Sequence, residues 1–153
     1  MICSCQRSTG VVSNIPLLVR EKLEVINKIY PSTKYVCVVN REGELIASLM
    51  EEETPTSESL IAIATLKSSA LQFASTLQQI DCPVLHLTGE TYMFSLYEVG
   101  DFLLAFYTEI HGGSSFSTLD LTEEEANQML EVVSDLRLML QNVIVAQKDN
   151  NMV

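Results

Sequence analysis

Histidine and cysteine side chains form most zinc sites and take part in many nucleophilic active sites, so they are the first candidates for chemistry in this sequence. The chain contains the histidines His86 and His111 and the cysteines Cys3, Cys5, Cys37 and Cys82. Cys82 and His86 are four residues apart, but a strand and turn there would not bring the two side chains together as a helix would. A metal site built from the two histidines would need Cys or carboxylate partners at ligand spacing. We therefore expect His86 on a sheet face or edge, and Cys37 as an inert thiol within an apolar strand.

Motifs for nucleophilic and phosphate chemistry are missing from the sequence. There is no G-x-S-x-G elbow for a serine nucleophile, and neither G-x-x-x-x-G-K-[ST] nor G-x-G-x-x-G for a nucleotide phosphate. No lysine follows the Gly112-Gly113-Ser114-Ser115 stretch, and its composition is typical of a flexible loop. Glu109 lies two residues before His111 at the end of an expected strand, where such a pair is more often solvated than an acid–base couple. We therefore expect no catalytic residue, no cofactor and no metal ion, and a protein that is not an enzyme.

The charge balance is strongly acidic. The chain has 20 acidic and 9 basic residues, a formal net charge of −11, and its cations are scattered. Binding to a polyphosphate or to an anionic membrane needs several cations on one face, so we expect neither nucleic acid nor a membrane surface as partner. No apolar run approaches the roughly 20 residues of a membrane helix, and we expect no membrane span.

The first residues leave two interpretations of the cysteines open. Residues 1–12 lack periodicity and the features of a signal peptide, which predicts a flexible tail on a protein of the reducing cytoplasm. Cys3 and Cys5 could carry acyl chains that tether the protein, or they are unmodified thiols on a loose tail. Ile2 stands where myristoylation requires glycine, and Arg7 is the only nearby cation to reinforce an anchor.

Apolar spacing and turn residues predict the order helix, two strands, helix, three strands, helix. Ser13 and Asn14 are expected to cap the first helix, and Pro31 ends it. Thr122 with Glu125 forms a capping box for the last helix. The strands are expected at residues 35–39, 45–49, 84–88, 92–98 and 102–108, and the middle helix at residues 60–80.

This order predicts a layered α+β domain. Five mostly antiparallel strands would form one sheet with helices on both faces. The chain of 153 residues is long enough for one such domain, which we expect over residues 13–147. Residues 148–153 are expected to be frayed.

The expected helix at residues 60–80 has an unusually wide apolar arc. At about 100° per residue its apolar side chains span roughly 200°, about twice what one sheet face needs. Only Lys67 and Gln78 interrupt the arc, and the remaining side is uncharged and short. This pattern predicts a second contact, either with another copy of the chain or a related partner, or with the chain's own long loops folded over the helix.

Several segments resemble the roadblock family of dynein light chains and GTPase regulators. The resemblance covers about residues 15–146, and it rests on the order of elements and on three segments: 35–49, the small-residue helix 66–77, and 96–106. It implies the architecture α-β-β-α-β-β-β-α, no catalytic residue, and a dimer in which the middle helix and the third strand meet their counterparts. The N-terminal tail and the loop 111–121 depart from the family pattern, which leaves the identity of the partner open.

The resemblance implies a dimeric scaffold or adaptor. Its partners would be a small GTPase, a lysosomal GTPase assembly or a dynein intermediate chain, and the dimer a homodimer or a heterodimer with a related domain. The small residues permit close helix approach, and an edge strand needs a partner. We therefore expect the dimer interface at Leu60, Ala64, Lys67, Ser68, Leu71, Ala74, Val84 and His86. A longin-like trafficking adaptor, which normally begins with strands, and a small-molecule sensor, which needs converging polar groups, remain as alternatives.

Overall fold

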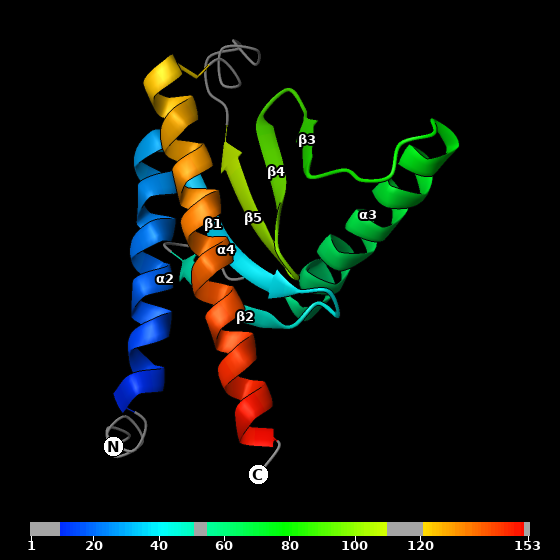
Figure 1. Cartoon of the computed structure of the whole chain (residues 1–153). Coiled ribbons are helices and arrows are strands. Elements are labelled where there is room, and N and C mark those ends of the chain that lie inside the picture. The colour runs from blue at the N-terminus through cyan, green and yellow to red at the C-terminus, as the bar shows by residue number, and fades with distance from the viewer. Residues whose placement is uncertain (1–9, 51–54, 110–120, 152–153) are drawn as a thin grey trace.

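A computed structural model describes the backbone of residues 10–50, 55–109 and 121–151. Its elements follow the predicted order (Figure 1). They are α2 (Gly10–Ile29), β1 (Thr33–Asn40), β2 (Leu45–Met50), α3 (Ser57–Thr76), β3 (Val84–Thr88), β4 (Tyr92–Val99), β5 (Phe102–Glu109) and α4 (Glu123–Asn151). No helix in these ranges is both long and apolar enough to cross a membrane.

The strands form one five-stranded sheet in the order β2-β1-β5-β4-β3. Every neighbouring pair is antiparallel, and β3, β4 and β5 are the predicted meander. The pairing of β1 with β2 shifts register between Val38 and Val39. The two edges of the sheet are therefore β2 and β3. The predicted α+β fold with helices on both faces of the sheet is confirmed.

The larger core lies between the sheet and the helices α2 and α4, which run side by side on one face (Figure 1). Leu23 and Ile26 of α2 and Leu136 of α4 are fully buried there, together with Phe106 of β5. The ring of Tyr30 packs on Phe106 with 5.2 Å between centroids. Burying one such aliphatic or aromatic side chain contributes about 1.5–3 kcal/mol, so this face holds most of the stability.

Of the described helices, α3 alone lies on the opposite face, above a smaller core. Leu60 and Ile63 of α3 pack there against Cys37, Val39 and Leu103 of the sheet. Burial raises the pKa of the Cys37 thiol to about 12, so the thiol stays protonated at neutral pH. The predicted place of Cys37 within a buried apolar strand is confirmed, and the inertness of its thiol stays a prediction.

Local hydrogen bonds explain where two helices begin. The capping box of α4 forms as predicted: the Glu125 amide donates to Thr122 Oγ1 at 3.1 Å, and the Thr122 amide donates to Glu125 Oε1 at 3.0 Å. In α3 the Ser59 amide donates to Thr56 Oγ1 at 3.1 Å. This cap starts α3 at Ser57, three residues before the predicted start.

The helix α2 ends at Ile29, before Pro31 as predicted, but three other helix ends differ from the prediction. The helix α2 begins at Gly10, so Ser13 and Asn14 lie inside it and do not cap it. The helix α3 ends at Thr76, because Gln78 adopts a left-handed φ of 63° and the Gln79 amide donates to Ala74 O at 3.0 Å. The apolar period continued beyond this stop and made the predicted helix four residues too long. The helix α4 continues to Asn151, into the end that was expected to be frayed.

Candidate protein-interaction surface

The helix α3 touches the sheet with its first half only. Beyond Lys67 no residue of α3 is fully buried, and Phe73 is 65% exposed. After the helix ends, Leu77 is 57% and Ile80 95% exposed. Figure 1 shows α3 leaning away from the sheet toward its C-terminal end. The described part of the chain therefore covers the N-terminal half of the wide apolar arc and leaves much of its C-terminal half exposed.

The strand β3 extends this apolar surface at the edge of the sheet. Val84 is 41% exposed and Leu87 42%, and they lie on opposite faces of the strand. Among the described residues only β4 pairs with β3, so its outer edge carries no strand. An open edge of this kind is a template for pairing with another strand.

Aromatic side chains cover the sheet on the side of α3. The rings of Tyr35 and Tyr107 lie 5.8 Å apart and those of Tyr92 and Tyr107 6.1 Å apart, between centroids. Tyr92 is 38% exposed, and Phe94 is half-buried beside the smaller core. We give the name α3–β3 surface to a selected set of exposed and half-buried apolar residues from α3, the segment after it and the strands β3 and β4: Leu71, Phe73, Ala74, Leu77, Ile80, Val84, Leu87 and Tyr92.

The structure separates the eight residues expected at a dimer interface into two groups. Six of them have surface available to a partner: Ala64, Leu71 and Ala74 are half-buried, and Ser68, Val84 and His86 are exposed. Leu60 and Lys67 lie inside the protomer instead, 9% and 3% exposed. Leu60 packs in the smaller core, and the Lys67 ammonium donates a hydrogen bond to the Cys82 carbonyl oxygen.

Sequence reasoning missed part of the exposed apolar surface. Phe73, Leu77 and Ile80 lie on the apolar arc of the expected helix but are absent from the expected interface, because a helical wheel does not show where the helix leaves the sheet. Leu87 and Tyr92 could have been found from the apolar alternation of their strands. That signal gives the face on which a residue lies, but not what covers the face.

His86 lies on a sheet face, as predicted. Its Nδ1 is 2.8 Å from Ser95 Oγ, and its ring meets Tyr97 edge-on with 6.0 Å between centroids. Desolvation by these neighbours lowers the pKa of His86 below its ordinary value, so the ring is neutral at pH 7. Within the described ranges no three His, Cys, Asp or Glu side chains come together as metal ligands. His111 and the Gly112–Ser115 stretch lie outside the described residues.

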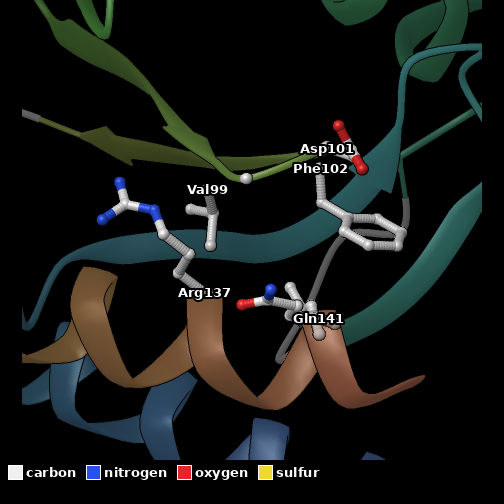
Figure 2. A pocket seen from close by; sticks show the side chains of 7 residues that line it. Val99, Asp101, Phe102, Arg137 and Gln141 are labelled. Carbon is white, nitrogen blue, oxygen red and sulfur yellow. The ribbon is translucent and has the colours of Figure 1, made fainter. Parts of the chain in front are cut away.

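A cavity of about 240 Å³ lies between the β4–β5 turn and α4, and Figure 2 shows the side chains that line it. Val99, Phe102 and Leu140 supply its apolar walls, and Arg137, Asp101 and Gln141 its polar groups. The Asp101 carboxylate is directed away from Arg137 and Gln141 (Figure 2), and Arg137 Nη2 donates to Glu98 O at 3.5 Å. Small-molecule sites have polar groups that converge on one ligand. This cavity does not have that arrangement.

The arrangement of a five-stranded antiparallel sheet, paired helices on one face and a single helix on the other is the roadblock-like fold. MglB in a tetrameric arrangement matches with a TM-score of 0.66 and 14% identity, over 84% of this chain and 91% of that one. The gliding protein MglB of Thermus thermophilus matches with a TM-score of 0.64 and 15% identity, over 81% and 89%. A Roadblock/LC7 domain of Streptomyces avermitilis matches with a TM-score of 0.57 and 11% identity, over 74% and 90%. No protein-family model and no curated protein matches the sequence.

Proposed function

We propose that this chain is a non-enzymatic adaptor that dimerises through the α3–β3 surface and, as a dimer, binds or regulates a small GTPase or a motor or lysosomal complex. Two observations carry the proposal: Phe73, Leu77 and Ile80 are exposed at the C-terminal end of α3, and the outer edge of β3 carries no described strand. Exposed apolar side chains cost free energy in water, and where they gather they mark an interaction site.

The charges on α3 are compatible with a second copy, or a related chain, as the occupant of this surface. Two copies with a net charge of −11 each repel one another, and an uncharged contact surface keeps this repulsion smallest. The helix α3 provides such a region, because Glu58 and Lys67 are its only charged residues. Lys67 is buried, and Glu58 lies in the first turn, far from Phe73 and Leu77.

The edge of β3 gives the dimer its second contact. Pairing with β3 of another copy would satisfy the backbone groups along the open edge and continue the sheet across the dimer. The resemblance to the roadblock family implies that the same helix and strand contact the corresponding helix and strand of the partner. The tetrameric arrangement described for MglB, which matches in fold, supports the assembly of several copies.

The proposal that a small GTPase is the partner rests on the resemblance to roadblock regulators. It also takes into account that the sequence has no motif by which this chain would bind a nucleotide itself. A longin-like adaptor is the weaker candidate, because the solved structures reported above as matches in fold are MglB and Roadblock/LC7 domains. Isolation of the tagged chain from its own cells, with mass spectrometry of what co-purifies, tests this half of the proposal. Recovery of a GTPase or a motor subunit supports it, and recovery of vesicle-coat or tether proteins alone contradicts it.

Replacement of Leu71 by Asp tests the interface. Leu71 is half-buried on α3, and an aspartate there would bury an unpaired charge between two copies. The expected loss is about 4 kcal/mol of association free energy, or roughly a thousandfold in Kd. Sedimentation equilibrium should show a wild-type dimer at micromolar concentration and a monomeric Leu71→Asp protein.

The control is Ser69→Asp, which places the same charge at an exposed position on the other side of α3 and should leave the dimer intact. Circular dichroism shows whether each variant is folded. A wild-type protein that is monomeric both alone and after purification with its native partners contradicts the proposal. So does a folded Leu71→Asp protein that still dimerises.

A further inference from the structure

The carboxylate of Glu98, at the end of β4, meets two cations from distant parts of the chain. Arg41 Nη2 lies 2.9 Å from Glu98 Oε2, and Lys67 Nζ lies 3.6 Å from the same oxygen. Arg41 belongs to the turn between β1 and β2 and also donates to Gly100 O at 3.1 Å. One carboxylate oxygen thus joins α3, β4 and the β1–β2 turn.

The backbone adds two contacts between the same segments. The amide of Glu98 donates to Pro83 O at 2.8 Å, and the ammonium of Lys67 donates to Cys82 O. Cys82 and Pro83 lie in the segment that leads from α3 into β3. The end of β4 therefore holds both α3 and the segment that returns from it to the sheet.

Lys67 is also the last point at which α3 is buried. The preceding contacts of α3 with the sheet are apolar and come from Leu60, Ile63 and the half-buried Leu66. After Lys67 the helix continues for nine residues, about 14 Å at 1.5 Å per residue, with no fully buried side chain. A small rotation at Lys67 therefore becomes a large displacement of Phe73 and of the rest of the α3–β3 surface.

A buried ammonium strongly favours positions in which a carboxylate is near. Lys67 is 3% exposed, and an unpaired charge at that depth is costly. Apolar contacts are non-directional and tolerate sliding, whereas Lys67 must remain near both Glu98 and the Cys82 carbonyl. We propose that Glu98, acting through Lys67, is the positioning residue that fixes the direction of α3 and so the shape of the α3–β3 surface.

This inference concerns the direction of a helix within one chain, and it does not depend on which partner covers the surface. Glu98→Gln keeps the shape of the side chain and removes its charge, which leaves the Lys67 ammonium without a carboxylate. Residual dipolar couplings of the backbone amides in the full chain measure the direction of α3 against the five strands. In the wild type one alignment tensor should fit helix and sheet together. In Glu98→Gln the α3 couplings should no longer fit the wild-type direction.

Glu44→Gln is the matched control. It removes the same charge from the β1–β2 turn, where the Glu44 carboxylate accepts a hydrogen bond from Asn40 Nδ2 at 2.6 Å, and should leave α3 in place. A change of α3 direction in this variant, equal to that in Glu98→Gln, would show an effect of net charge and overturn the proposal. So would wild-type α3 couplings in Glu98→Gln.

A double variant keeps the test decisive if Glu98→Gln alone does not fold. Lys67→Met with Glu98→Gln removes the buried charge and keeps the length of the buried stem, a change that buried ion pairs often tolerate. If α3 keeps the wild-type direction in the double variant, packing by Leu60 and Ile63 sets that direction and the proposal is wrong. If α3 departs from it, the proposal stands. Sedimentation of the same samples reports separately on the proposed dimer.

Discussion

Opposing effects act on the pKa of the Glu98 carboxyl group, and a pH series tests their net result. Partial burial raises the pKa of Glu98, but the hydrogen bond from Arg41 and the charges of Lys67 and Arg41 outweigh it, so the pKa is lowered overall. A carboxylate with a lowered pKa in the folded state stabilises the protein above its ordinary pKa, and this contribution is lost as the pH falls through the lowered value.

We therefore expect the free energy of unfolding of the wild type to exceed that of Glu98→Gln at neutral pH. The difference should close as the pH falls below about 4, because a protonated carboxyl resembles the glutamine amide. Urea unfolding of both proteins over this range measures it. Glu90→Gln, an exposed glutamate in the β3–β4 turn, is the control for general charge removal. A difference that persists unchanged into acid would show that Glu98 acts by its shape and not by its charge.

The sequence could not reveal this cluster of charged side chains. Arg41 and Glu98 are 57 residues apart, and only the pairing of the sheet brings the β1–β2 turn beside the end of β4. Lys67 interrupts the apolar arc of the expected helix. A single cation in an apolar pattern does not reveal whether its side chain faces a partner or its own sheet. The burial of the Cys37 thiol was predictable because its place in an apolar strand is a local property.

At the scale of elements, the β1–β2 turn and the start of α3 are in close contact. Gly43 has a φ of +88°, and a Cβ on it would lie 3.0 Å from Ile61 Cα. A left-handed φ costs most other residues about 1–2 kcal/mol, and a backbone contact of this kind cannot be relieved by rotating a side chain. The turn and α3 therefore constrain each other.

We expect Gly43→Ala to lower the free energy of unfolding by at least about 1–2 kcal/mol. Denaturant unfolding followed by circular dichroism measures the loss. Glu42→Ala, a change at the exposed neighbouring position, should cost much less. Equal midpoints for Gly43→Ala and the wild type would mean that the turn adopts another conformation.

Element types and order were predictable from local patterns, and element ends were less so. The capping box of Thr122 and Glu125 marked the start of α4 correctly, because its hydrogen bonds are made within four residues. The end of α3 was misjudged, because Gln78 takes a left-handed conformation that glycine adopts far more often. The lean of α3 depends on contacts between distant segments, and helical periodicity carries no information about it.

At the scale of the whole molecule, a large net charge and an uncharged surface oppose each other. Each copy carries a net charge of −11, and this charge is spread over the protein. The α3–β3 surface is apolar, so the repulsion between two copies comes from charges outside the contact and acts over a distance. Salt screens this repulsion, but it does not weaken the apolar contact. The Debye length falls from about 30 Å at 0.01 M salt to about 10 Å at 0.1 M.

We expect the dimer to become tighter as sodium chloride rises from about 0.01 M to about 0.15 M, because screening removes repulsion without weakening apolar burial. Sedimentation equilibrium on the wild type at several salt concentrations gives the Kd, and sodium chloride is preferred to sulfate, which strengthens apolar burial by itself. An interface held by ion pairs would respond in the opposite direction, because salt weakens attraction between exposed charges. A Kd that rises with salt would therefore exclude the α3–β3 surface as the main contact and point to the charged side chains of α2 or α4.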